Sequence, residues 1–172
     1  AVMEAVEQCR NSGMRRVFCA VRPPGHHAEA SEARGFCIFN NIAVAASHLL
    51  HRLGFTRVVI IDVDAHHGNG TQEIFYNTKK VLYISVHEDP TGFPGTGFVD
   101  EVGDGEGIGY TVNVPLPFRI DDAIYKRAFD EIVLPIAKQF KPQFVLVSAG
   151  FDGHYTDPVG NFALSMSCYD ER

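Results

Sequence analysis

Short, continuous apolar runs recur along the chain and predict strands that are buried on both faces. The clearest runs cover residues 58–63, 81–86 and 144–149, and a weaker run covers residues 17–21. Strands of a parallel sheet that is covered by helices on both sides have this composition, whereas strands with one solvated face alternate between apolar and polar residues. The pattern therefore predicts a mainly parallel sheet.

Helical periodicity fills much of the chain between these strands. Over residues 40–53 the apolar side chains recur on one helical face, with Asn40 placed to cap the helix and Gly54 to end it. Residues 122–140 form a second helical segment, which Pro135 must kink or divide because proline lacks a backbone N–H. Alternating strands and helices are typical of the α/β class.

The composition narrows the function classes. The chain has 172 residues, of which 45% are apolar, and 15 basic against 21 acidic residues give a formal charge of −6, which disfavours direct nucleic-acid binding. No apolar stretch approaches the roughly twenty residues of a membrane span. Four cysteines without a C-x-x-C pair favour a reducing compartment. Because no basic nuclear-localisation-like run is present, we expect a cytoplasmic protein, or a nuclear one in a eukaryote; the oligomeric state stays open.

Acidic and histidine side chains gather where the apolar run 58–63 ends. Asp62, Asp64 and His66 alternate along the chain, so they point the same way for as long as the backbone stays extended. Two carboxylates at the end of a buried strand repel each other unless a cation neutralises them. The spacing therefore predicts a metal site; the alternative is a turn whose acids cap the next helix.

Two other apolar runs end in groups that suit the same site. Asp152 follows the run 144–149, and Ser85 and His87 close the run 81–86. Ligands of open α/β sheets bind outside the carboxyl ends of the strands, so we expect these groups to converge. A set of carboxylates and imidazoles without a thiolate suits a catalytic Zn²⁺, with Mn²⁺ or Fe²⁺ as alternatives.

Two adjacent histidines, His26 and His27, lie in a proline-rich loop after the weaker run. Neighbouring loop residues seldom both bind one small ion. An imidazole titrates near neutral pH, so we interpret the pair as acid/base groups of a catalytic site. The alternative is an ordinary surface pair.

Five motifs occur in a fixed order. They are RPPGHHA (residues 22–28), GFCIFNN (35–41), DVDAHHGNGT (62–71), FPGTG (93–97) and AGFD (149–152). Together they resemble the histone deacetylase family, and the forms GNG and GFD resemble its class II and bacterial branch. The resemblance implies the arginase/deacetylase fold, an α/β fold with three α-β-α layers, a mainly parallel sheet and a zinc site at its carboxyl edge.

The resemblance also implies roles for individual residues. It makes Asp64, His66 and Asp152 the ligands of one zinc ion, and His26 and His27 the tandem catalytic histidines. In the family each of these histidines has a partner residue. The position of the first partner corresponds to Asp62 and that of the second to Asn69. Because Asn69 is uncharged, we expect His27 to be less basic than in relatives that carry Asp there.

Substrate and potassium sites are implied in the same way. Gly35, Phe36 and Phe93 match substrate-binding positions, the two aromatic rings flanking the acyl-lysine stem. A buried potassium site is implied at Asp62, Asp64, His66 and Ser85. The family's Gly-Gly-Tyr motif and its N-terminal substrate loop have no counterpart here, so we expect residues 1–172 to be the central part of one catalytic domain, incomplete at both ends.

The expected function is zinc-dependent hydrolysis of the acetyl amide of acetyl-lysine in proteins, with His27 as general base and acid. One alternative is an acetylpolyamine amidohydrolase, because the same slot admits any acetylamino alkyl chain. A second is a non-catalytic relative that binds acyl-lysine. A binuclear manganese ureohydrolase is disfavoured, because His67 and Gly68 stand where a further acid would be needed. Whether the segment is active by itself is left open.

Two further features are interpreted as structural. His48 and His51 lie opposite the apolar stripe of their helix, and we expect both to be solvated. Cys37 has no basic neighbour in sequence, so a buried structural thiol is expected rather than a nucleophile.

Overall fold

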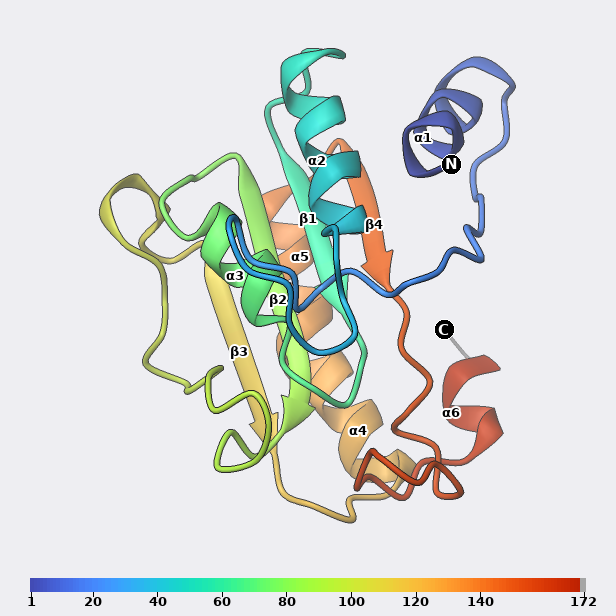
Figure 1. Ribbon diagram of the computed structural model, residues 1–172, viewed down its shortest axis with the longest axis vertical. Helices are drawn as coiled ribbons and strands as arrows, with labels where there is room; N and C mark the ends of the chain where they lie inside the picture. Colours follow the sequence, from blue (N-terminus) through green and yellow to red (C-terminus); the bar gives the residue numbers. More distant parts are fainter. Residues whose placement is uncertain (171–172) are drawn as a thin grey trace.

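A four-stranded parallel sheet forms the centre of the computed structural model, which describes residues 1–170. Its strands are β1 (Val58–Asp62), β2 (Val81–Glu88), β3 (Thr111–Leu116) and β4 (Phe144–Ser148). They are arranged in the order β3-β2-β1-β4, and each neighbouring pair is parallel (Figure 1). All four strands therefore end at the same edge of the sheet, where Asp62 pairs in register with Ser85 of β2 and Ser148 of β4.

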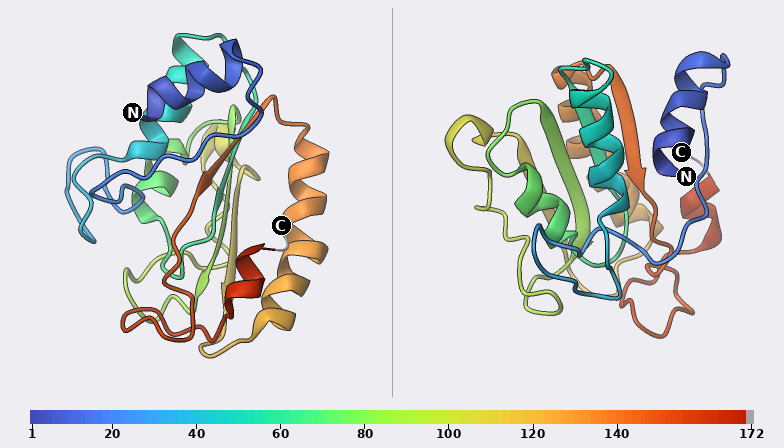
Figure 2. Two further views of the ribbon diagram at one scale, coloured as in Figure 1. Left: turned by 90° about the vertical axis from the view of Figure 1, so that its right-hand side faces the viewer. Right: turned by 45° about the horizontal axis from the view of Figure 1, so that its top comes forward.

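Helices cover both faces of this sheet and give three layers, which Figure 2 shows edge-on. One layer contains α1 (Val2–Asn11), α2 (Asn41–His51) and α3 (Asn69–Phe75). The other contains α4 (Asp122–Ala128), the π-helical turn η2 (Phe129–Val133), α5 (Leu134–Phe140) and α6 (Met166–Asp170), and the short 3₁₀ turn η1 (Gly105–Gly107) precedes β3. The predicted three-layer α-β-α fold is confirmed. Among residues 1–170, no helix has the length and apolarity to cross a membrane.

Two hydrophobic cores lie on opposite faces of the sheet, because neighbouring strand residues point to opposite sides. Val58 and Ile60 of β1 pack with α2, whereas Val59 between them packs into the core under α4 and α5. β2 repeats the alternation, with Tyr83 on the first face and Ile84 on the second. Both central strands are thus apolar on both faces, as their sequence predicts.

Two predictions about strands are wrong. The run at residues 144–149 does form β4, but neither of its faces is fully buried. Phe144 and Leu146 are partly buried on the side of α2. Val145 and Val147 on the other face are 52% and 53% exposed, because β4 lies at the edge of the sheet. The weaker run at residues 17–21 forms no strand. It runs as an irregular segment from α1 towards the carboxyl edge of the sheet (Figure 1), and Phe18 is 72% exposed.

The predicted helix signals act as expected. Asn40 accepts a hydrogen bond from the backbone N–H of Ala43 at 3.0 Å and caps α2, and Gly54 has a positive φ of 73° just after that helix. The segment 122–140 is divided by the turn η2, immediately before Pro135 at the start of α5. At the start of α5 the missing N–H of proline interrupts no hydrogen bond within that helix.

The prediction that His48 is solvated is wrong, whereas His51 is exposed as predicted. Nε2 of His48 lies 2.9 Å from Oε1 of Glu7 on α1, so the polar side of α2 is in contact with the neighbouring helix. This hydrogen bond lowers the pKa of Glu7. The thiol of Cys37 is buried, and burial raises its pKa, in agreement with a structural rather than a nucleophilic role.

Candidate metal centre

Three side chains from two loops at the carboxyl edge form a compact donor set: Asp64, His66 and Asp152. One ligand atom of each lies within 4.8 Å of the others, and each side chain is partly exposed. Nδ1 of His66 lies 2.6 Å from Oδ2 of Asp152 and 3.3 Å from Oδ1 of Asp64. Asp152 also accepts the backbone N–H of Ala65 at 2.8 Å, which ties the loop after β4 to the loop after β1.

The donor set fits a divalent cation. Hydrogen bonds to the carboxylates of Asp152 and Asp64 raise the pKa of His66 to about 10, against the effect of burial. These carboxylates therefore place a negative potential at the imidazole nitrogen, and a divalent cation there would compete with the proton. Three nitrogen and oxygen ligands without a thiolate leave coordination positions open, as in catalytic zinc sites.

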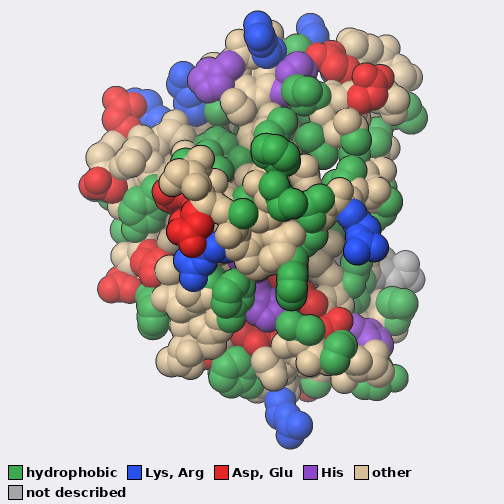
Figure 3. Space-filling view, viewed as in Figure 1, with side chains coloured by type: hydrophobic (Ala, Val, Ile, Leu, Met, Phe, Trp, Pro, Cys, Tyr) green, Lys and Arg blue, Asp and Glu red, His purple; other side chains and the backbone are tan. Residues whose placement is uncertain are grey.

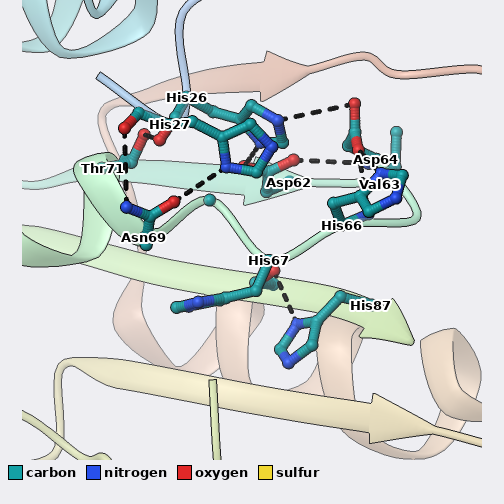
Figure 4. Close-up of polar contacts among 12 residues, drawn as sticks. His26, His27, Asp62, Val63, Asp64, His66, His67, Asn69, Thr71 and His87 are labelled. Carbon is teal, nitrogen blue, oxygen red and sulfur yellow. Dashed lines mark hydrogen bonds and ion pairs between the residues drawn. The ribbon is translucent and has the colours of Figure 1, made fainter. Parts of the chain in front are cut away.

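Asp62, although close in sequence, has a different position from Asp64. Its backbone is the last residue of β1 and its side chain is fully buried. Oδ2 of Asp62 lies 2.9 Å from Nδ1 of His26, and both residues are labelled in Figure 4. The same oxygen accepts a hydrogen bond from the hydroxyl of Tyr83 at 3.2 Å. The strand ends at Asp62, so the alternating spacing does not bring all three predicted groups into one cluster; Asp62 lies behind the donor set and contacts a histidine.

His26 and His27 have opposite electrostatic surroundings. Burial lowers the pKa of His26, but the carboxylates of Asp62 and Asp64 outweigh it and raise that pKa to about 9. Burial, together with the neighbouring His26, lowers the pKa of His27 to about 4. At neutral pH His26 is thus a cation and His27 a neutral imidazole, although the two rings are only 4.0 Å apart. Burial contributes most to the lowered pKa of His27, whereas the hydrogen bond with Asn69 raises it. That His27 is less basic than in relatives with Asp at position 69 stays a prediction.

Asn69, at the start of α3, holds the second histidine. Its Oδ1 lies 2.8 Å from Nδ1 of His27, so this amide is the polar partner of His27 that the sequence predicts. The same amide donates from Nδ2 to Oε1 of Glu29 at 2.6 Å. Glu29 was not among the predicted site residues; its position directly after the tandem histidines and Ala28 is the only sequence signal for it.

Two glycines allow close approaches in this site. Gly35 has a φ of 52°, and a Cβ there would lie 2.2 Å from Cδ2 of His27. At Gly150 a Cβ would lie 2.1 Å from Oδ2 of Asp64. Gly35 therefore lies against the ring of His27, which is a positioning contact in addition to the predicted substrate-binding role.

The predicted aromatic residues lie on the outer side of the centre. The centroid of the Phe93 ring lies 5.0 Å from that of His27 and 6.1 Å from that of His66. The side chain of Phe93 is half-exposed. Phe36 is 87% exposed. In Figure 3, histidine and acidic side chains reach the surface together below the centre of the view, with apolar side chains around them. This arrangement gives a polar centre with an apolar border.

Ser85 and His87 do not join the donor set. Both are fully buried on β2, Oγ of Ser85 lies 2.8 Å from Nδ1 of His87, and Nε2 of His87 lies 2.9 Å from the carbonyl oxygen of Gly97. His87 therefore connects β2 to the loop that carries Phe93, a role for which the sequence offered no explanation. Ser85 remains next to Asp62 in the sheet register, where the potassium site is predicted.

The fold and this centre define a class. It is an α/β domain whose sheet edge carries a triad of two carboxylates and an imidazole with ligand atoms within 4.8 Å of one another, next to one charged and one neutral histidine. Comparison with known proteins agrees with it. The sequence pattern of the histone deacetylase domain family matches residues 1–172. The chain belongs to the histone deacetylase family.

Individual relatives are similar over almost the whole chain. A probable deacetylase of Archaeoglobus fulgidus is 48% identical over 169 residues, which are 98% of this chain and 46% of that protein. Human histone deacetylase 9 is 45% identical over 98% of this chain and 17% of its own length. The chain thus spans less than half of these relatives.

Solved structures agree with the fold. The crystal structure of the HDA15 HD domain superimposes with a TM-score of 0.91 at 45% identity, covering 98% of this chain and 48% of that one. An acetylpolyamine aminohydrolase from Burkholderia pseudomallei gives a TM-score of 0.88 at 42% identity, with 94% and 47% covered. The arginase/deacetylase fold inferred from the motifs is thereby confirmed.

Proposed function

We propose that this chain carries the catalytic centre of a zinc-dependent deacetylase that hydrolyses the acetyl amide of acetyl-lysine in proteins. Asp64, His66 and Asp152 would hold one zinc ion. The observation that carries the proposal is His27: a buried, neutral imidazole beside a divalent-cation donor set, on the side where Phe93 borders the surface. Membership of the histone deacetylase family supports it.

A zinc ion in such a site polarises a carbonyl group and makes a water molecule more acidic. The chain's own residues then divide the proton chemistry. His27 is neutral at pH 7, so it accepts a proton from the attacking water on Nε2 and returns it to the leaving amine. His26 is a cation at that pH and lies 3.6 Å from Asp64, where it offsets negative charge. Asp62 fixes the orientation of His26 through its 2.9 Å contact.

The substrate side of the proposal involves the apolar border. Phe93 and Phe36 would flank the methylene stem of the acylated lysine. Gly35, next to Phe36, lies against the ring of His27. A potassium ion at Asp62, Asp64, His66 and Ser85 is proposed as a structural cation, as the family resemblance implies. Asp62 and Ser85 pair in register at the end of the sheet, which supports this proposal. A cytoplasmic location, or a nuclear one in a eukaryote, is proposed from the sequence alone.

Acetylated polyamines are the second candidate substrate. The favouring observation is the similarity to the acetylpolyamine aminohydrolase from Burkholderia pseudomallei at 42% identity, close to the 45% of the HDA15 domain. A binding protein without catalysis is disfavoured, because both histidines and all three donor residues are present and in contact.

The test compares two substrates on the full-length, zinc-loaded protein. We expect kcat/KM for an acetyl-lysine peptide to exceed that for N-acetylputrescine at least about tenfold, a difference of about 1.4 kcal/mol in transition-state binding. A reversed ratio would replace the protein substrate by a polyamine. Calorimetric binding of the peptide without any release of acetate would identify a non-catalytic acyl-lysine-binding protein.

A further inference from the structure

The side-chain amide of Asn69 has all of its polar atoms occupied. Nδ2 donates to Oε1 of Glu29 at 2.6 Å and to the carbonyl oxygen of His27 at 3.5 Å, and Oδ1 faces Nδ1 of His27 at 2.8 Å. Asn69 is buried, so water does not replace these partners. The amide thus connects a carboxylate on one side to the catalytic imidazole on the other.

The direction of this chain of hydrogen bonds follows from Glu29. A carboxylate only accepts hydrogen bonds, so it fixes the NH₂ group of Asn69 on its own side and leaves the amide oxygen for His27. An oxygen accepts only from a protonated nitrogen, so the proton of neutral His27 is held on Nδ1. Nε2 then keeps its lone pair, and Nε2 is the atom that must accept the proton from water.

The carbonyl oxygen of His27, at 3.5 Å, lies beyond the usual hydrogen-bond distance and holds the amide only weakly, so Glu29, at 2.6 Å, is the acceptor that orients it. Without Glu29 the orientation of the amide is ambiguous. The amide can turn over and present the NH₂ group to Nδ1 of His27, which then becomes the acceptor and moves the ring proton to Nε2. An aspartate at position 69 would have no such ambiguity, because both of its oxygens accept. A second, fixed acceptor is therefore needed here because residue 69 is an asparagine.

We propose that Glu29 is a positioning residue that selects the reactive tautomer of His27 by orienting the amide of Asn69. The inference rests on the proposed function, in which His27 is the base. Glu29 is itself held in place: NH1 of Arg34 lies 3.3 Å from its Oε1, and its backbone N–H donates to the carbonyl of Glu32 at 3.0 Å. Its side chain is 23% exposed, so a substitution there does not open the core.

The decisive experiment is a double-mutant cycle in the full-length, zinc-loaded protein, with the variants Glu29→Ala, Asn69→Asp and both together. We expect Glu29→Ala to lower kcat about ten- to a hundredfold with KM changed less than about twofold, since Glu29 acts on the base and not on the substrate. In the background of the Asn69→Asp variant, the same change should alter kcat less than about twofold, because an aspartate needs no orienting partner. Equal losses in both backgrounds would overturn the proposal.

Two further variants separate orientation from mere packing. Glu29→Gln keeps an acceptor oxygen, which Arg34 orients, and should retain most of kcat. Glu32→Ala removes an exposed carboxylate from the same loop and should leave both constants unchanged. A loss in Glu29→Gln as large as in Glu29→Ala would contradict the role of the acceptor oxygen.

A spectroscopic measurement tests the tautomer without turnover. In protein labelled with ¹⁵N-histidine, the side-chain shifts of His27 should show the proton on Nδ1, and Glu29→Ala should move part of the population to Nε2. An unchanged tautomer ratio would refute the inference. If the native protein hydrolyses no acetyl-lysine peptide, the proposed function fails, and this measurement alone still decides on Glu29.

Discussion

Nδ1 of His66 lies 2.6 Å from Oδ2 of Asp152, although the two residues are 86 positions apart in the sequence. Each lies in the loop after a strand, and these strands, β1 and β4, are parallel neighbours whose last residues, Asp62 and Ser148, pair in register. The contact is thus a direct product of sheet topology. Side chains that point outward just beyond these two strands can therefore meet at one point.

Asp152→Asn should abolish high-affinity metal binding. The variant keeps an oxygen for the N–H of Ala65 but removes the negative charge that faces His66. We expect zinc affinity, measured by competition with a chromophoric chelator, to fall at least about a hundredfold. The control variant Asp100→Asn makes the same replacement of a carboxylate by an amide at an exposed position, and it should bind zinc normally. Equal affinity of the two variants would contradict the assignment of Asp152 as a ligand.

His27→Ala should separate catalysis from metal binding. His27 makes its polar contact with Asn69 and not with the donor set, so the zinc content of the variant should remain at about one per chain. Loss of a general acid and base typically lowers kcat by about 10²- to 10⁴-fold. His51→Ala, an exposed histidine on α2, provides the control. Near-normal turnover of an acetyl-lysine peptide by His27→Ala would exclude the proposed role.

The two central strands and the cap of α2 could be predicted because their signals are local. A continuous apolar run, or an asparagine before an apolar stripe, carries its meaning in neighbouring residues. The exposed face of β4 could not be predicted in this way. Val145 and Val147 are as apolar as their counterparts in β1, and their exposure depends on which helix lies over them in space.

In the site, too, some features could be predicted from the sequence and others could not. The motifs pointed to Asp64, His66 and Asp152 together, and the structure places them within one small volume. The separate position of Asp62 depends on the residue at which β1 ends, which the sequence does not specify to within one position. Glu29 was missed because its contact with Asn69 spans 40 positions and has no periodic signal.

Gly35→Ala should impair both stability and catalysis, and a matched variant separates the causes. Gly35 and Gly105 have φ values of 52° and 54°, but a Cβ meets His27 at 2.2 Å only at Gly35 and meets nothing within 4 Å at Gly105. The backbone strain alone should lower the free energy of unfolding by roughly 1–2 kcal/mol in both variants. Only Gly35→Ala should also lower kcat, because the ring of His27 must move.

Urea unfolding and kcat of the two alanine variants check this comparison. If Gly105→Ala lowered kcat as much as Gly35→Ala, general destabilisation and not displacement of His27 would be the cause. If Gly35→Ala kept full activity, the ring of His27 would tolerate a shift that the 2.2 Å approach makes unavoidable.

The buried pair His67 and His87 should make the protein sensitive to mild acid. Burial, together with His87, lowers the pKa of His67 to about 2, and burial also lowers the pKa of His87. Unfolded histidines titrate at about 6.5, so below that pH the unfolded chain binds protons at these two positions that the folded protein excludes. The free energy of unfolding must therefore fall as the pH falls, by up to roughly 2.7 kcal/mol per pH unit from the pair.

The pH range from about 6 to 5, below the ordinary histidine pKa, suits this measurement in the metal-free protein. His26 and His66, whose pKa values are raised to about 9 and about 10, are protonated in the folded protein and largely protonated in the unfolded chain there, so they add little slope. His87→Gln removes one group of the pair, so its unfolding free energy should depend on pH less steeply, by up to roughly 1.4 kcal/mol per unit. His51→Gln, at an exposed position, should keep the original slope. Identical slopes for His87→Gln and the native protein would show that His87 is protonated inside the fold, against the lowered pKa that its burial demands.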